Sequence, residues 1–253
     1  MKIGPFTPPD VREAILREQE HPHVLPVAML PDMYLSIAGF TIWITSHEGN
    51  PLNFVDERVL APFIVAPMDA PDFILSTERV TEPFYLPVDN TGNVSGEMTN
   101  LKWVINSVNW MLSWDPSHPN QVGCKYLGTL MTCISALRLF IAHQLLAQKR
   151  GLLFHASAAA CNNNTFVFLG HSGAGKSTSA YHAPCQLLAD ETVAVLGGPD
   201  GKYFVRGTPF GGEHFPSAAT GPNPAFFFLE KSNHNARKPL STRNAVAQLL
   251  SQT

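Results

Sequence analysis

The sequence has little charge for its length of 253 residues. Asp, Glu, Lys and Arg make up 15% of it, against about 25% in an ordinary globular protein. The 17 basic and 20 acidic residues give a net charge of −3, so the composition does not favour a nucleic-acid or membrane-surface partner. Because hydrophobic residues reach 45%, the chain has the apolar content of a folded domain rather than of a disordered one.

Targeting and redox signals are also missing. The first 20 residues contain no apolar signal core, which argues against secretion. The most membrane-like stretch, residues 126–146, is interrupted by Arg138 and His143, whereas a bilayer span needs roughly 20 apolar residues. The cysteines form no C-x-x-C pair. We therefore expect a cytoplasmic protein with four reduced thiols: Cys124, Cys133, Cys161 and Cys185.

Proline divides the chain. There are 21 prolines and twelve precede residue 90, yet none lies between Asn120 and Ala183. The proline-rich part has short runs of β-branched and aromatic residues, which predict strands: 33–37, 40–45, 63–65 and 84–88. We predict a β-rich N-terminal region over 1–119, suited to acceptor or partner recognition, and a second domain over 120–253.

The middle of the chain offers helical patterns. Trp103, Trp110 and Trp114 are spaced by seven and four residues, which would place them on one packed helical face, although this segment is ambiguous. A long helix is predicted over 125–150, with Gly151 as its stop. After it, two apolar runs around 162–164 predict a hairpin that ends in residues 165–169.

The hairpin leads into GHSGAGKS at 170–177, which satisfies the Walker A pattern G-x-x-x-x-G-K-[ST]. Gly170, Gly173 and Gly175 allow backbone N–H groups to converge on a phosphate. Lys176 supplies a cation for the β- and γ-phosphates, and the Ser177 hydroxyl is a ligand for Mg²⁺. The expected nucleotide-binding residues are Gly170, His171, Ser172, Gly173, Ala174, Gly175, Lys176, Ser177 and Thr178.

An acid follows the loop after an unusually short step. Asp190 ends the short apolar run 185–190, only 14 positions after Lys176. That leaves room for a helix of about two turns, ended by Pro184, whereas a parallel crossover usually needs a dozen or more residues. The spacing therefore disfavours a Ras-type or AAA-type core. Ser177, Asp190 and the adjacent Glu191 are the expected Mg²⁺ ligands, with a solvated turn as the alternative for the two acids.

Taken together, LFHASA at 153–158, GHSGAGKST at 170–178 and LLADETVAV at 187–195 resemble the HPr kinase/phosphorylase family. The resemblance is strongest to HPr kinase-like proteins of bacterial gene clusters, some of which phosphorylate ribosomally made peptides. It covers residues 151–253. It implies an α/β (α+β) fold: a P-loop core of mixed β-sheet with helices, shared with phosphoenolpyruvate carboxykinases, plus a smaller β-rich N-terminal region.

The resemblance also implies roles. His155 matches a histidine upstream of the loop, near the acceptor, although a satisfied core histidine is the alternative. Asp190 matches the first residue of an Asp-Asp pair that serves Mg²⁺ and the acceptor hydroxyl, and Glu191 replaces the second. The segment VRGTPFGGE at 205–213 stands where true HPr kinases carry another signature. Arg206 or Glu213 of this segment is a candidate for contact with phosphate or acceptor.

These features favour a kinase that uses ATP and Mg²⁺ and acts on a serine or other hydroxyl of a peptide or small protein. Asp190, His155 and Lys176 are its expected catalytic residues. Self-association is expected from the resemblance alone. The alternative is a non-catalytic ATP-binding regulatory protein, favoured by the short C-terminus and by Glu191. A decarboxylating carboxykinase is disfavoured because such enzymes are about twice this length.

Overall fold

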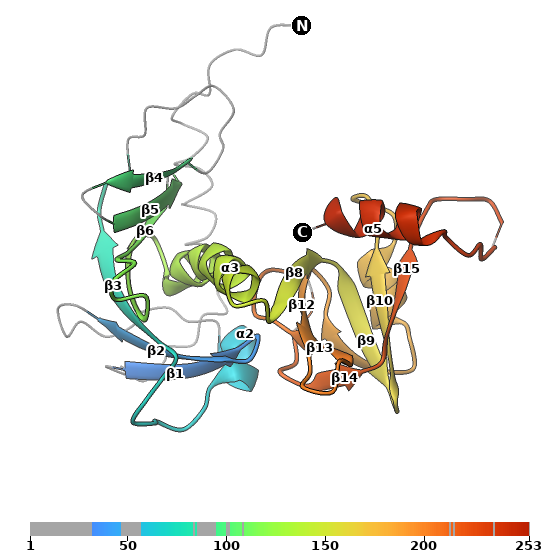
Figure 1. Ribbon diagram of the computed structural model, residues 1–253, viewed down its shortest axis with the longest axis horizontal. Helices are drawn as coiled ribbons and strands as arrows, with labels where there is room; N and C mark the ends of the chain where they lie inside the picture. Colours follow the sequence, from blue (N-terminus) through green and yellow to red (C-terminus); the bar gives the residue numbers. More distant parts are fainter. Residues whose placement is uncertain are drawn as a thin grey trace, which may run out of the picture.

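The structure, a computed structural model, describes residues 32–46, 57–82, 84, 95–99, 102–107, 109–212, 214, 216–234 and 236–252. The described part is a mixed α/β structure that is rich in strands and has few helices (Figure 1). Three sheets make up most of it. The predicted α/β class is confirmed at this level.

A seven-stranded sheet forms the N-terminal half. Its order is β1-β2-β3-β7-β6-β5-β4. Alternate residues of β1 and β2 are buried, as expected for strands with one face on the core. The strands are β1 Asp32–Ile37, β2 Phe40–Ser46, β3 Phe73–Val80, β4 Ser95–Thr99, β5 Lys102–Ser107, β6 Trp110–Trp114 and β7 Gln121–Leu127.

Two sequence-based expectations in this half are wrong. The tryptophans do not share a helical face, because β5 and β6 pair as an antiparallel hairpin with Trp103 opposite Trp114 in the register. A spacing of four also keeps Trp110 and Trp114 on one side of a strand, so spacing alone did not decide. The strand expected at 63–65 is instead the end of the 3₁₀ helix η1 (Ala61–Phe63) and one bridge at Ile64. The run at 84–88 lies outside the described residues beyond Phe84.

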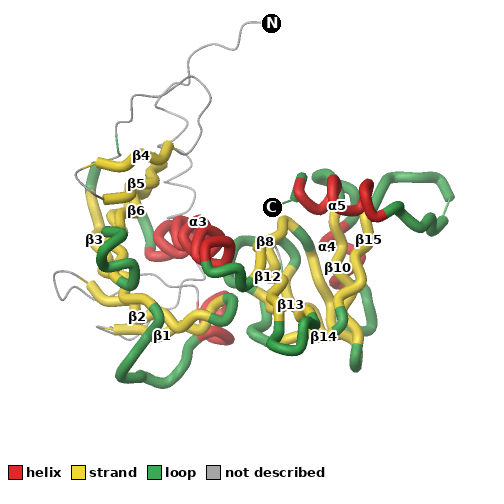
Figure 2. The backbone as a smooth tube through the Cα atoms, in the orientation of Figure 1, coloured by secondary structure: helices red, strands yellow, loops and turns green. Residues whose placement is uncertain are grey.

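Helix α3 (Leu130–Ala147) is the central helix of the fold. It lies between the seven-stranded sheet and the C-terminal strands (Figure 2). Its side chains Ile134, Leu137 and Phe140 are fully buried in the larger hydrophobic cluster. By length and composition alone α3 is long and apolar enough to cross a membrane, but this packing is that of a core helix.

Helix α3 begins five residues later and ends three residues earlier than the predicted helix over 125–150. Residues 125–127 belong to β7, and Gly128, with φ +91°, separates strand from helix. At the other end Lys149 takes the left-handed conformation, φ +53°, that we expected of Gly151. Gly151 instead lies in β8, where a β-carbon would collide with the carbonyl oxygen of Val195. Close approach of two strands therefore requires this glycine.

The C-terminal half is a sandwich of two four-stranded sheets. Apolar side chains from both sheets, among them Phe154, Val167 and Val193, form the smaller hydrophobic cluster. One sheet has the order β14-β13-β12-β8 and the other β11-β9-β10-β15. The strands are β8 Gly151–His155, β9 Ser157–Cys161, β10 Asn164–Leu169, β11 Gln186–Ala189, β12 Thr192–Gly197, β13 Tyr203–Gly207, β14 Thr220–Pro222 and β15 Pro224–Phe228.

This topology refines the predicted C-terminal elements. The hairpin across 162–164 is confirmed as β9 and β10, but its first apolar run is split at Ala156 between two sheets. The pattern of residues 241–253 predicts a capped helix with Ala245, Val246, Leu249 and Leu250 facing inward, and helix α5 (Thr242–Leu250) is indeed capped by the Ser241 side chain. Val246 and Leu250 are, however, 49% and 64% exposed.

The boundary proposed between residues 119 and 120 stays a prediction. Strand β7 begins just after that boundary, yet it pairs with β3 and β6 in the seven-stranded sheet. The change from this sheet to the C-terminal sandwich takes place along α3, between β7 and β8. The link is reinforced by Arg150, which donates to the carbonyl of Gly39 at 2.8 Å and lies 4.2 Å from the ring centre of Phe40.

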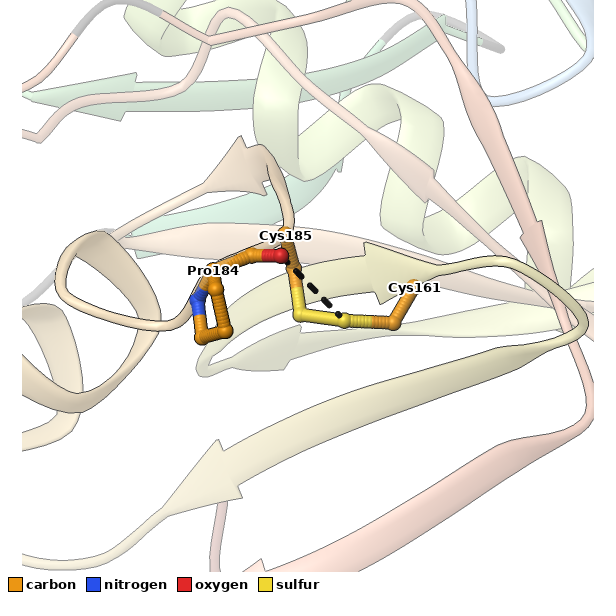
Figure 3. Close-up of a disulfide and its surroundings, with 3 residues drawn as sticks. All are labelled: Cys161, Pro184 and Cys185. Carbon is orange, nitrogen blue, oxygen red and sulfur yellow. Dashed lines mark hydrogen bonds between the residues drawn. A yellow bond between two sulfur atoms is a disulfide. The ribbon is translucent and has the colours of Figure 1, made fainter.

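A disulfide corrects the expectation of four reduced thiols. Cys161 at the end of β9 is bonded to Cys185, which immediately precedes β11 (Figure 3). The two cysteines face each other because β9 and β11 are antiparallel neighbours with Ala160 opposite Gln186. The bond encloses β10, the phosphate loop and the following helix. In the chain-entropy account, closing a loop of this length stabilises the fold by about 3 kcal/mol.

The thiols give a direct test of this pairing. Cys124 and Cys133 are free and buried, and burial raises the pKa of the Cys133 thiol well above its ordinary value. The native chain, purified without reductant, should therefore resist iodoacetamide. Mass spectrometry should find two adducts after denaturation alone and four after denaturation with reductant. Four adducts without reductant would contradict the disulfide.

Candidate functional site

Strand direction gathers the candidate site at one edge of a sheet. In the order β11-β9-β10-β15, strand β9 is antiparallel to both β10 and β11, so β10 and β11 run the same way. Strand β15 is parallel to β10 (Figure 1). The carboxyl ends of β10, β11 and β15 therefore meet at one edge, which is where open α/β sheets bind ligands. The phosphate loop, Asp190 and the residues after β15 come from these three ends.

The loop that follows β10, residues 170–177, carries the predicted Walker A pattern, and its glycines adopt the conformations that the pattern predicts. Gly170, Gly173 and Gly175 all have positive φ, at +141°, +74° and +97°, a region that other residues rarely enter. At Gly170 a β-carbon would lie 2.6 Å from the carbonyl oxygen of Leu229. Neighbouring β15 thus adds a second reason for glycine at this position. His171, Ser172 and Gly173 are exposed at the mouth of the loop.

Lys176 lies inside this loop. Although charged, it is buried, and its Nζ donates to the carbonyl oxygens of Gly170 at 3.0 Å and His171 at 3.4 Å. Lys176 begins helix α4 (Lys176–Tyr181), which also carries Ser177 and Thr178. An ammonium group held over the loop by two neutral carbonyls is ready to exchange them for phosphate oxygens, which are stronger acceptors.

Asp190 is joined to the loop through its backbone. Its carbonyl oxygen accepts hydrogen bonds from the hydroxyls of Ser157 at 2.7 Å and Ser177 at 3.2 Å. Ser157 starts β9 and is fully buried. The hydroxyl that we expected on a metal therefore contacts the backbone of Asp190, and this contact places the loop serine next to the predicted acid.

The Asp190 carboxylate has a partner that the sequence analysis missed. Its Oδ2 accepts from the backbone N–H of His214 at 3.1 Å and lies 2.8 Å from the Nδ1 of the same histidine. Asp190 is 1% exposed. The His214 ring also lies against the ring of Tyr181 in α4, with 4.1 Å between centres. A buried carboxylate needs such partners, because an unsatisfied one would be strongly penalised.

Two glycines bring this histidine into place. Gly211 and Gly212 have φ values of +81° and +111°, and they pass directly over the two acids. A β-carbon on Gly211 would lie 3.1 Å from Glu191, and one on Gly212 would collide with Oδ1 of Asp190. In the sequence, the adjacent glycines at 211 and 212 were the signal that this segment can pass close to the two acids.

Glu191 and His155 form a separate, accessible pair. His155 Nδ1 lies 3.2 Å from Oε1 of Glu191, and the two side chains are 45% and 38% exposed. Both positions are fixed by the backbone, because Ala156 donates to the carbonyl of Glu191 at 3.0 Å. The structure thus brings together His155, Glu191, Asp190 and the loop, but it pairs Glu191 with His155. Arg206 instead donates to Thr220 on β14, and Glu213 lies outside the described residues.

The residues fit Mg²⁺ only as part of a shared site. The described residues contain no group of three or more His, Cys, Asp or Glu side chains that would hold a metal ion. Mg²⁺ in kinases, however, is usually held by one or two protein oxygens together with substrate phosphates and water. The Ser177 hydroxyl lies 3.2 Å from the main-chain carbonyl oxygen of Asp190, and so next to the residue whose carboxylate is the other expected ligand. Ser177 and Asp190, rather than Glu191, are the ligands that this arrangement supports.

A cavity elsewhere in the sandwich is not part of this site. It has a volume of about 480 Å³ and is lined by Leu152, Phe154, Tyr203, Phe226 and Leu249, among others. None of its lining residues belongs to the phosphate loop or to the two acids. The chemistry of the loop, rather than the size of a cavity, therefore identifies the candidate site.

No protein-family model matches the chain, and no curated protein matches it in sequence.

The partnership between His214 and Asp190 predicts a coupled loss of stability. His214→Ala removes the Nδ1 contact from a buried carboxylate and should lower the free energy of unfolding by about 1–3 kcal/mol. His234→Ala, in an exposed loop, is the matched control and should change it by less than about 0.5 kcal/mol. Urea unfolding of His214→Ala, Asp190→Asn and the double variant measures the coupling. Additive effects would show that the contact contributes nothing.

Proposed function

We propose that this protein is an ATP- and Mg²⁺-dependent kinase with an HPr kinase-like P-loop core, which transfers the γ-phosphoryl group to a serine or other hydroxyl of a peptide or small protein. The observation that carries the proposal is the phosphate loop at 170–177, which holds the buried Lys176 on its own carbonyls and is joined by the Ser177 hydroxyl to the backbone carbonyl of Asp190. A nucleoside triphosphate is the common ligand of such a loop. The short step from loop to acid supports the HPr kinase-like assignment.

The roles follow from position. Loop N–H groups and Lys176 bind the polyphosphate, and Ser177 and Asp190 hold Mg²⁺. Bound Mg²⁺ supplies charge neutralisation for the phosphate oxygens. In the reaction the acceptor oxygen forms a bond to the γ-phosphorus while the bond from this phosphorus to the bridging oxygen breaks. ADP leaves with the electron pair of that bond, and the acceptor proton goes to a carboxylate.

Exposure separates the two acids. Asp190 is 1% exposed and covered by Gly212 and His214, so an acceptor reaches it only after the loop that carries them moves. Glu191 is accessible, and its Oε1 lies 3.2 Å from Nδ1 of His155. We therefore assign the acceptor proton to Glu191, oriented by His155, and metal binding to Asp190.

Partners and location follow the same proposal. The acceptor is a peptide or small protein, and the β-rich N-terminal region is the surface proposed to recognise it, while nucleic acid and membrane are not proposed partners. The proposed location is the cytoplasm, which supplies ATP. The Cys161–Cys185 disulfide is the observation against this location, because the cytoplasm keeps most thiols reduced. A fully oxidised pair in acid-quenched cells would contradict the cytoplasm.

One observation favours a second function, a non-catalytic ATP-binding regulatory protein. The burial of Asp190 under His214 leaves an acceptor no direct path to this carboxylate. In that case ATP would bind without turnover, and the loop over Asp190 would report its presence.

Nucleotide binding tests the feature that both functions share. Lys176→Ala should raise the Kd for ATP about 10- to 100-fold, because it removes a charged hydrogen-bond donor worth about 1.5–3 kcal/mol. Lys202→Ala is the control, since Lys202 pairs with Asp200 on an exposed turn. Calorimetric titration with Mg·ATP measures both. Equal affinities in Lys176→Ala and the unaltered chain would refute a phosphate site at this loop.

Phosphoryl transfer separates the two functions. ATP labelled at the γ-phosphate, incubated with the chain and with protein products of neighbouring genes, should label one acceptor. EDTA should abolish this labelling, and Glu191→Gln should reduce it at least tenfold, as expected for loss of general base catalysis. ATP binding without any labelled product would favour the regulatory function. Undiminished labelling in both Asp190→Ala and Glu191→Gln would contradict the roles assigned to the acids.

A further inference from the structure

The end of β15 brings a second cation to the phosphate loop. Lys231 comes three residues after this strand, and its Nζ lies 3.7 Å from the point that a β-carbon on Gly173 would occupy. Gly173 is exposed in the middle of the loop. The sequence pattern gave no sign of this approach, because Lys231 is 55 positions after Lys176.

The backbone holds this approach in place. Strands β10 and β15 pair in parallel up to Leu169 and Phe228. The pairing continues one step further, since the N–H of Leu229 donates to the carbonyl of Leu169 at 2.7 Å. Gly170 then passes the carbonyl of Leu229 too closely for any side chain. Lys231 therefore leaves the sheet beside the loop because the two strands end together.

The charge of Lys231 has no acidic partner in the described part of the chain. The ion pairs found there involve Lys125, Lys202, His118, His155 and His214, and none involves Lys231. Lys176 is already inside the loop, on carbonyl oxygens. Two ammonium groups thus approach the same short loop from the ends of two neighbouring parallel strands, an arrangement that favours a ligand with several negative charges.

We propose that Lys231 is a phosphate-binding residue that contacts the polyphosphate of the nucleotide across the loop from Lys176. This inference rests on the proposed function and adds a ligand to the same site. It predicts selectivity by phosphate number: Lys231 favours a nucleoside triphosphate over a diphosphate, and it contributes nothing to a monophosphate. Its exposed side chain keeps most of its hydration until the nucleotide arrives, so the energetic cost of holding it there is small.

The test compares the affinities for ATP, ADP and AMP between variants that remove or keep the charge at position 231. For Lys231→Ala we expect the Kd of Mg·ATP to rise roughly tenfold, that of ADP to rise less, and that of AMP to stay unchanged. Lys231→Arg, which keeps the charge, should bind ATP within about threefold of the unaltered chain. Lys238→Ala is the matched control, because Lys238 is an exposed lysine of the same C-terminal connection. Calorimetric titration at one fixed salt concentration gives all values.

The outcomes separate this inference from the proposed function. Loss of ATP binding in Lys176→Ala with unchanged binding in Lys231→Ala would overturn the role of Lys231 and leave the phosphate loop standing. An equal loss of affinity for ATP and for AMP in Lys231→Ala would also overturn it, because a lysine that contacts the polyphosphate should affect the affinity for ATP more than that for AMP. If the unaltered chain does not bind ATP at all, both proposals fail.

Discussion

The carbonyl oxygen of Asp190 is the acceptor on which the candidate site depends. It receives the hydroxyls of Ser157 and Ser177, and so connects the first residue of β9, the phosphate loop and the end of β11 at one buried point. Neither hydroxyl acts on the carboxylate. The carboxylate of Asp190 instead contacts His214, while the backbone carbonyl of Asp190 fixes the distance between the loop and the acid.

This contact depends on the order of the strands. An antiparallel β9 between β10 and β11 lets two strands run the same way with only a short helix between them. The same order places Cys161 opposite Cys185, so the disulfide encloses the segment that carries the loop. Loop, acid and disulfide are three consequences of one sheet arrangement.

The local elements of the site could be predicted from the sequence, and their contacts could not. The Walker A pattern predicts strand, loop and helix because glycine conformations and a lysine at fixed spacing are local requirements. The run before Asp190 predicts β11 for the same reason. His214, Lys231 and the disulfide depend on which strands become neighbours, and neither periodicity nor spacing along the chain reports this. The helical face predicted for the Trp103–Trp114 segment was wrong for a different reason, because a spacing of four residues fits both a helix and a strand.

The burial of Asp190 separates the roles that we propose for the two acids. A carboxylate that is 1% exposed suits a metal ligand held ready for phosphate better than a base open to an acceptor. The exposed pair of Glu191 and His155 is better placed for the acceptor. Both functions proposed for this chain therefore share a nucleotide site and differ in whether a phosphoryl group is transferred to an acceptor.

A crystal structure with Mg²⁺ and a non-hydrolysable ATP analogue tests the central claim most directly. The account predicts the β- and γ-phosphates inside loop 170–177, with Lys176 moved from the carbonyls of Gly170 and His171 onto phosphate oxygens, and the metal ion between Ser177 and Asp190. A nucleotide bound elsewhere, such as in the cavity lined by Leu152 and Phe226, with the loop lysine still on its carbonyls, would contradict it.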